Sequence, residues 1–153
     1  MRKLLKLVGF LTLTGYLATM LAALIIRLLR PSRGDEDSNE LDLVTAYNGL
    51  ELASRAPAFR GGASLTMFGG ADIDLRAATL DPAGADLTVQ TIFGGTNLVV
   101  PEGWNVLLDD RTIMGGSDNS TVGDGSGEGP ALRVRALTLF GGLEISSRSR
   151  RDD

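Results

Sequence analysis

The sequence predicts an all-β domain of the β-solenoid or β-helix type, built from five short repeats, after one N-terminal transmembrane helix. Four observations lead to this prediction. One short phrase recurs five times in 153 residues, and the first thirty residues contain a long apolar run. Glycine contributes 20 of the 153 residues, or about 13%, against an average of about 7% in a typical chain. This high glycine content favours short elements joined by turns. The 43% apolar content argues against a disordered chain.

Residues 1–30 are predicted to be a single-pass membrane anchor. Residues 7–26 contain no charge, and twenty helical residues span roughly 30 Å, the thickness of the hydrocarbon layer. A cleavable signal peptide and a buried soluble helix are the alternatives. The run is longer than the signal-peptide core of about 7–15 residues, and no small-x-small cleavage motif follows it. Basic residues flank the run on both sides: Arg2, Lys3 and Lys6 before it, and Arg27, Arg30 and Arg33 after it.

The orientation of this anchor depends on a small difference in charge. Three basic residues on each side nearly cancel under the positive-inside rule. The free amino terminus adds one positive charge on the N-terminal side, which favours an N-terminus inside the cell. The body of the protein would then lie on the outer side of the cell membrane.

Residues 31–40 are predicted to be an acidic flexible linker, because they are polar and turn-prone with no apolar period. All 19 acidic residues lie at or after Asp35, where only nine arginines accompany them, so this part carries a net charge of 9 − 19 = −10. Nucleic-acid binding requires clustered basic residues, so no nucleic-acid partner is expected. Residues 147–153 are predicted to be a polar tail.

The repeats define a predicted domain over residues 41–146. Each phrase contains threonine, an apolar residue, Phe, Tyr or Met, and then Gly-Gly or Asn-Gly, and successive threonines lie 21, 25, 21 and 26 residues apart. The residues that carry the pattern are Thr45, Tyr47 and Gly49; Thr66, Phe68, Gly69 and Gly70; Thr91, Phe93, Gly94 and Gly95; Thr112, Met114, Gly115 and Gly116; and Thr138, Phe140, Gly141 and Gly142.

Each repeat is predicted to form a strand, a bend at the glycines, and a second short strand. A unit of this length cannot bury its own apolar face, so stacked copies would share one core. The aromatic position lies two residues after the threonine, on the same strand face, and we expect it to be a core column. We expect the threonines to form an internal hydroxyl ladder; a partner-binding surface is the alternative. The intervening positions occupy the opposite face: Ala46, Met67, Ile92, Ile113 and Leu139.

Three runs of this chain together resemble a known family. The runs are Ala58–Leu80, Thr91–Trp104 and Ala136–Ile145, which contain the FGG phrases with DLR and VPEGW between them. They resemble the LiaF-like (YvqF-like) C-terminal domain of bacterial cell-wall-active antibiotics response proteins. The resemblance implies an all-β repeat domain attached to a membrane anchor, with a role in sensing cell-envelope stress beside a sensor histidine kinase. It implies no catalytic residues.

This chain departs from the family pattern in two ways. LiaF-type proteins carry several transmembrane helices before the domain, whereas one span is predicted here. The fourth repeat is also degenerate, with Met114 in the aromatic position and Asn119 where an apolar residue is expected.

The residue types available for chemistry are limited. The chain has no Cys and no His, which excludes disulfides, thiolate nucleophiles, Cys/His zinc sites and histidine-centred triads. The pairs Asp72/Asp74 and Asp109/Asp110 are candidates for acid–base work, but a solvated outer face is the expected explanation. We therefore predict that the protein is not an enzyme, that it has no catalytic residues and that it binds no cofactor.

One Gly-rich loop, Ser117–Gly129, resembles a calcium loop through Asp124, Ser126 and Glu128. The twelfth position counted from Asp124 is Arg135, where an EF-hand requires a bidentate glutamate. No metal site is predicted.

Two functions are compatible with these features. The first is a single-pass membrane-anchored, non-enzymatic interaction domain that acts as an accessory or regulator in cell-envelope stress sensing, with a sensor histidine kinase or another envelope protein as partner. The alternative is a membrane-tethered structural protein that self-assembles through stacked β repeats, as bactofilins do, giving a homo-oligomer. Uncapped terminal repeats favour the alternative. Trp104 is expected either to cap the core at a turn or to anchor a contact.

Overall fold

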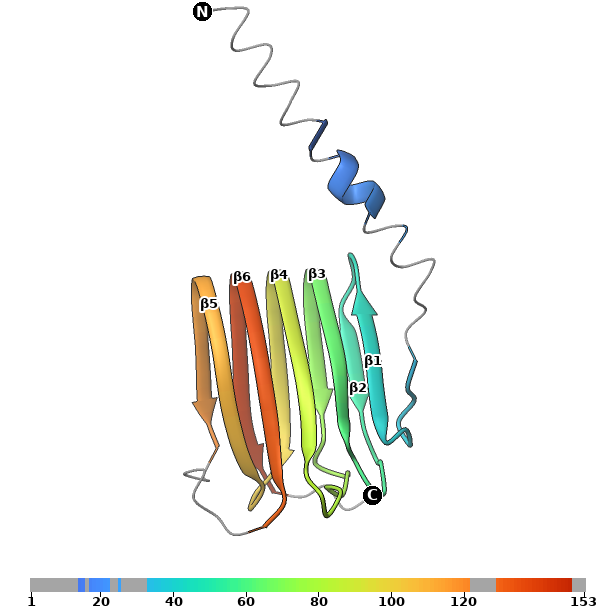
Figure 1. The fold of residues 1–153 in the computed structure, drawn as a ribbon, viewed down its shortest axis with the longest axis vertical. Helices are drawn as coiled ribbons and strands as arrows, with labels where there is room; N and C mark the ends of the chain where they lie inside the picture. The colour runs from blue at the N-terminus through green and yellow to red at the C-terminus, as the bar shows by residue number, and fades with distance from the viewer. Residues whose placement is uncertain (1–13, 16, 23–24, 26–32, 122–128, 150–153) are drawn as a thin grey trace, which may run out of the picture. The chain divides into compact units, whose positions relative to one another are not determined.

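The computed structural model describes residues 14–15, 17–22, 25, 33–121 and 129–149. The chain divides into two compact units, Met1–Pro31 and Ser32–Asp153. In the second unit the described residues form one six-stranded parallel sheet, so the prediction of an all-β body is confirmed (Figure 1). Its strands are β1 (Glu40–Thr45), β2 (Leu50–Ala53), β3 (Gly61–Asp74), β4 (Ala85–Pro101), β5 (Asn105–Ser120) and β6 (Ala131–Arg148).

The described residues of the first unit are helical. No helix that they form is long and apolar enough to cross a membrane. Most of the predicted span lies outside the described residues, so the transmembrane anchor stays a prediction.

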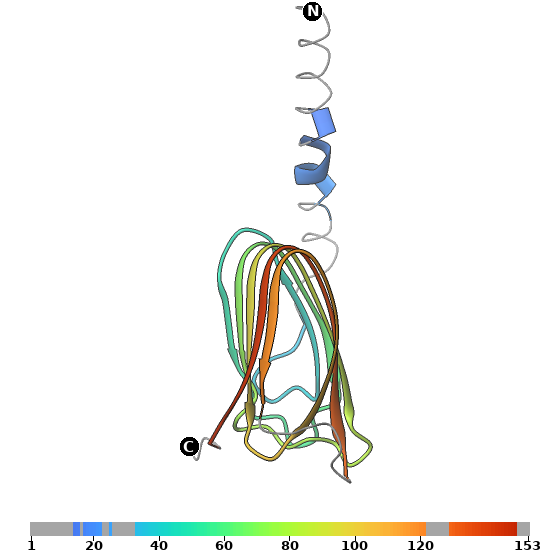
Figure 2. The same cartoon turned by 90° about the vertical axis from the view of Figure 1, so that its left-hand side faces the viewer.

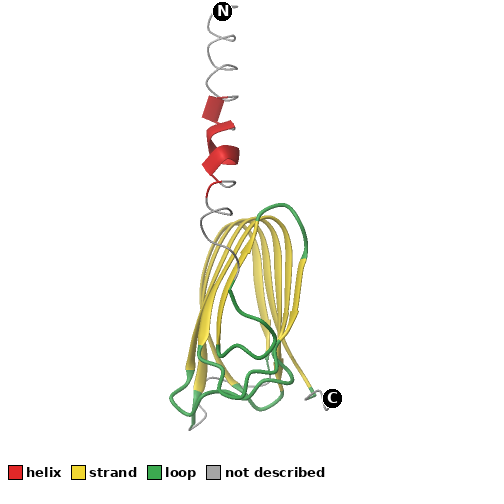
Figure 3. Ribbon diagram, turned by 90° about the vertical axis from the view of Figure 1, so that its right-hand side faces the viewer, coloured by secondary structure: helices red, strands yellow, loops and turns green. Residues whose placement is uncertain are grey.

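The long strands of the body are bent into nested arches. Figure 2 shows each of them rising, turning over and descending, and Figure 3 shows most of the loops gathered at the open end, opposite the bends. β3, β4, β5 and β6 run continuously through their Gly-Gly pairs, whereas residues 46–49 separate β1 from β2. Each predicted strand–bend–strand unit is therefore one arch.

The five repeats stack in register. Thr66 pairs with Thr45 on one side and with Thr91 on the other, and Thr138 lies between Thr91 and Thr112. The glycines after them align in the same way, so the bends of neighbouring arches lie side by side. Like positions of the five phrases thus form columns that run across the strands.

The order of the arches differs from the order of the repeats along the chain. The sheet order is β1-β3-β4-β6-β5, with β2 beside β3, so the fifth repeat lies between the third and the fourth. The degenerate fourth repeat consequently forms one end of the stack. An end arch has a neighbour on one side only, and polar inward side chains suit it. Its inward positions are Asp110, Ser117 and Asn119, and their β6 counterparts are the buried Ala136, Leu143 and Ile145.

The core lies between the two arms of each arch. In β4 the first arm contributes Leu87 and Val89 and the second contributes Leu98 and Val100, all buried. The open end of the arches is closed by Phe59, which is fully buried, with its ring centroid 6.4 Å from that of Trp104. Trp104 therefore packs on the core at a turn.

The β1 edge of the stack is covered by the segment that precedes it. Arg33 and Asp42 exchange two backbone hydrogen bonds of 2.7 Å in an antiparallel bridge. The backbone N–H of Arg55 donates to the carbonyl of Glu36, and that of Arg60 donates to the carbonyl of Asn39. Residues 33–39 therefore pack on the sheet, where the sequence predicted a flexible linker, and they cap this terminal repeat.

The far end of the domain also differs from its predicted boundary. β6 continues to Arg148, because Ser147 and Arg148 pair with Val100 and Pro101. The sheet thus includes the first two residues of the predicted tail.

The threonine column lies inside the arches. Thr45, Thr66, Thr91 and Thr138 are all buried, and Thr112 on the end arch is half-buried. In β4 the hydroxyls of Thr91 and Thr96 face each other across the bend at 3.0 Å. The position of β3 that aligns with Thr96 is Ala71, and the buried hydroxyl of Thr66 has no hydrogen-bond partner among the described residues.

We expect Thr66→Val to raise the free energy of unfolding by roughly 1–2 kcal/mol, because it replaces an unsatisfied buried hydroxyl with a methyl group of similar size. Thr91→Val is the matched control: it removes the bond to Thr96 and should lower the free energy of unfolding by about 1 kcal/mol. Urea unfolding followed by circular dichroism measures both values. A loss of stability in Thr66→Val would contradict the expectation.

Candidate functional site

A row of stacked rings runs along the bends of the arches. We call this row, Tyr47, Phe68, Phe93, Phe140 and Met114, the aromatic ridge. Its successive ring centroids lie 5.3, 5.0 and 4.8 Å apart, with interplanar angles of 3°, 5° and 4°. The spacing follows the strand separation of about 4.8 Å, because each ring comes from a neighbouring arch. Met114 continues the row on the end arch, next to Phe140.

The prediction that this column belongs to the core is wrong. The exposed fractions are 44% for Tyr47, 41% for Phe93, 43% for Phe140 and 60% for Met114. The prediction assumed that residues two apart share a face, which holds only while a strand stays straight. Here the chain turns over directly after the threonine, so the threonine side chain faces inward and the aromatic ring stands on the outer crest of the bend.

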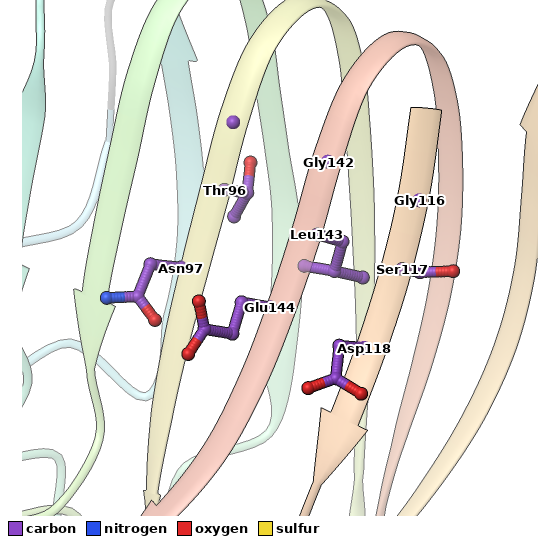
Figure 4. A pocket seen from close by; sticks show the side chains of 9 residues that line it. Thr96, Asn97, Gly116, Ser117, Asp118, Gly142, Leu143 and Glu144 are labelled. Atoms are coloured by element: carbon purple, nitrogen blue, oxygen red, sulfur yellow. The ribbon is translucent and has the colours of Figure 1, made fainter. Parts of the chain in front are cut away.

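A shallow groove lies beside the ridge on the descending arms. The second glycine of each pair, at Gly95, Gly142 and Gly116, has no side chain to fill the surface there. The resulting open groove has a volume of about 460 Å³, and Figure 4 shows the side chains around it. Its lining residues are Gly95, Thr96, Asn97, Gly116, Ser117, Asp118, Gly142, Leu143 and Glu144.

The far side of the groove is acidic. The strand register aligns one residue from each arch in what we call the acidic row, made up of Glu51, Asp72, Asn97, Glu144 and Asp118. Asn97 is half-buried and the four carboxylates are exposed. The Asn97 side-chain amide donates to a carboxylate oxygen of Asp72 at 3.2 Å. Side chains on adjacent strands lie close together, so the row forms a polar strip with carboxylates on both sides of the neutral Asn97.

The acidic row was missed at the sequence level, although a signal for it exists. The seventh position of the five phrases is occupied by Glu, Asp, Asn, Asp and Glu in chain order. An alignment of the phrases by their apolar positions alone leaves this position variable. Aligning the polar residues as well would have indicated the strip.

The two acidic pairs lie in different surroundings. Asp72 is exposed, while Asp74 receives hydrogen bonds from the guanidinium of Arg76 at 2.7–3.0 Å. Ile73 and Leu75 beside them are buried, so this pair lies on the outer face as expected.

The second pair lies on the end arch. Asp109 and Asp110 are both exposed, and a carboxylate oxygen of Asp110 accepts hydrogen bonds from the hydroxyls of Thr112 and Ser117. Among the residues that the structure describes, no group of three or more acidic side chains is arranged to hold a metal ion. The calcium-like positions Asp124, Ser126 and Glu128 lie outside the described residues.

Two loop carboxyl groups have shifted pKa values. The hydroxyl of Ser38 donates to Asp35 at 2.7 Å and lowers the pKa of that carboxyl. The backbone N–H of Ala83, at 2.9 Å, and the Arg60 side chain, at 3.2 Å, lower the pKa of Asp81. Both groups stabilise loops of the body, and neither belongs to the ridge, the groove or the acidic row.

Comparison with known proteins finds two similar chains. They are the uncharacterized proteins MT0994 and Rv0966c of Mycobacterium tuberculosis, from strains CDC 1551 and H37Rv respectively. Each is 28% identical over 123 residues, which cover 79% of this chain and 62% of the relative. The chain thus spans about three fifths of the length of these relatives. No family model matches the chain, and no solved structure matches it.

Proposed function

We propose that this protein is a single-pass, membrane-anchored, non-enzymatic protein whose β-repeat body binds a protein partner in the response to cell-envelope stress. The observation that supports the binding role best is the aromatic ridge. Its rings, of which Phe68 is half-buried and the others are exposed, form an ordered apolar row on the molecular surface, and such rows mark interaction sites. We also propose that the nested arches are a fold of the β-solenoid type.

The chemistry beside the ridge specifies the kind of partner. The ridge offers aromatic faces, and the acidic row beyond the groove offers carboxylates from Glu51, Asp72, Glu144 and Asp118. A segment that carries apolar side chains along one side and Lys or Arg along the other matches both rows. The same acidic row disfavours an anionic lipid surface as the occupant, since like charges repel.

The physiological setting in this proposal comes from the resemblance to LiaF-like domains together with the predicted anchor. In that setting the partner is a sensor histidine kinase or another envelope protein, and the chain acts as its accessory or regulator. In this proposal the body lies on the outer side of the cell membrane, where it would meet the extracytoplasmic part of such a partner.

The second candidate is a membrane-tethered structural protein that self-assembles through its repeats. What supports it is the edge of β5, which pairs only with β6 among the described strands. The segment 33–39 on the β1 edge weighs against head-to-tail filaments, because such filaments need both edges.

A complementation experiment tests the leading proposal. A strain of the source organism lacking the gene is challenged with a cell-wall-active antibiotic, and growth is compared after restoring the wild type or the ridge variant Phe93→Ser/Phe140→Ser. We expect the deletion to alter antibiotic tolerance and the ridge variant to behave like the deletion. Unchanged tolerance of the deletion strain would contradict the role in envelope stress.

The matched control is Leu137→Ser on β6. Leu137 is as exposed as Phe93, at 41%, but it lies on the rising arm away from the ridge. We expect this variant to restore wild-type growth at equal protein levels. Equal failure of both variants would mean that general destabilisation, rather than the ridge, accounts for the phenotype.

A further inference from the structure

The two ends of the stack differ in what covers them. On the β1 side, Arg33 bridges Asp42 of β1, and residues 36 and 39 accept hydrogen bonds from the segment after β2, while β2 itself pairs with β3. On the β5 side, no described segment pairs with the outer edge of β5. The apolar side chains with the largest exposed fractions in the described body lie on this open strand: Ile113 at 69% and Met114 at 60%. A long edge with unpaired backbone groups is a template for another strand.

Charge disfavours head-to-tail stacking on this edge. If β5 met the β1–β2 arch of another copy in the register of the repeat, Asp109 would lie opposite Asp42, and Asp118 would lie opposite Glu51. Like charges directly opposite each other on paired strands are destabilising. The segment 33–39 would also have to leave the β1 edge.

We propose that the open β5 edge pairs with β5 of a second copy of this chain, antiparallel and about a two-fold axis, so that the protein forms a closed dimer. The axis runs through the bend, which maps the rising arm of one copy onto the descending arm of the other. The inward residues Thr112 and Ser117 then lie opposite each other, because inward side chains must meet inward side chains. With the axis placed at the centre of the bend, between Met114 and Gly115, this requirement determines the rest of the register.

The register brings opposite charges together. Arg111 of each copy lies opposite Asp118 of the other, and the two-fold axis repeats this pair. Asp110 lies opposite Asn119, whose amide can donate to the carboxylate, and Asp109 lies opposite Ser120. No like charges face each other between residues 109 and 120.

The centre of the interface is apolar. The axis passes between Met114 and Gly115, so Met114 of each copy faces a glycine of the other, and Ile113 faces Gly116. The glycines leave room for the larger side chains, and the pairing would bury part of the exposed surface of Ile113 and Met114. The dimer uses Met114 of the ridge and Asp118 of the acidic row, but the argument for it rests on β5 alone and does not require the proposed protein partner.

Charge reversal tests the dimer. The full chain is purified in detergent micelles, and its mass is measured by light scattering over a range of concentrations. We expect the wild type to dimerise, and the single variants R111D and D118R each to raise the dissociation constant by about tenfold or more. The double variant R111D/D118R restores opposite charges and should return the constant to within about threefold of the wild type.

Disulfide trapping gives a second measurement that does not rely on affinity. Because the chain has no cysteine, the variant R111C/D118C introduces the only thiols, and paired strands bring opposite positions within bridging distance. We expect a covalent dimer under mild oxidation. The matched control is L137C/E144C, at the aligned positions of β6, which is paired on both sides and should not cross-link between copies.

Several results would overturn the proposal. A wild type that stays monomeric, assemblies larger than a dimer, or a dimer whose affinity neither single charge variant changes would each do so. Equal cross-linking of the β6 control would do so as well. If a charge variant fails to fold, as judged by its circular dichroism spectrum, the disulfide pair and its control decide the outcome.

Discussion

Replacing Gly94 with alanine is expected to lower the free energy of unfolding by more than about 3 kcal/mol, enough to unfold a marginally stable domain. Gly94 is the first glycine of the bend in β4, and its φ is +132°, a conformation that side chains rarely adopt. A Cβ at this position would lie 1.7 Å from the carbonyl oxygen of Gly69 on the neighbouring arch. The backbone of two stacked arches would have to separate to relieve the overlap.

Gly95→Ala is the matched control for this prediction. Gly95 is the next residue in the same bend, but a Cβ there would meet nothing closer than the carbonyl oxygen of Gly142 at 3.8 Å. We expect its free energy of unfolding to change by less than about 1 kcal/mol. Chemical unfolding of the full-length variants, followed by circular dichroism, measures the difference. Equal losses in both variants would show that the close approach of the arches is not what requires glycine.

Phe59→Ala is expected to cost about 3–5 kcal/mol of unfolding free energy. Phe59 is fully buried at the open end of the arches, where its ring closes the core against Trp104. Truncation leaves a cavity in the core beside Trp104. Trp104 is the only tryptophan, so its fluorescence during urea unfolding reports directly on this end of the body.

Leu137→Ala is the control for the core variant. Its side chain is 41% exposed on the outer face of β6, and its truncation should change the free energy of unfolding by no more than about 0.5 kcal/mol. A small loss in Phe59→Ala, similar to that of Leu137→Ala, would mean that the open end of the arches is not part of the cooperative core.

The all-β repeat body follows from local features of the sequence. The five threonine–aromatic–glycine phrases align in the sheet register, residue by residue, because strands with the same pattern place like side chains in the same columns. The inward position of Thr66, Thr91 and Thr138 also follows from the pattern, since alternation holds along the straight arms.

The candidate site could not be read from the same alternation. The aromatic ring follows the threonine by two residues, and at that point the chain turns over, so alternation predicts the interior while the bend places the ring outside. The acidic row was visible as a polar seventh position in each phrase. Its place across the groove from the ridge depends on the bend, which brings both rows to the outer surface.

Stacked, glycine-bent β repeats that follow an apolar N-terminal segment can be predicted from the sequence, because these properties depend on short-range pattern. The order of the arches and the covering of their edges follow from the three-dimensional packing. The polar Asp110, Ser117 and Asn119 suit an end arch, so β6 lies between β4 and β5, and residues 33–39 cover the opposite end. The order of the arches and the covering of their edges depend on which segments hydrogen-bond to each strand edge. Those segments lie far apart in the chain, so local sequence patterns do not identify them.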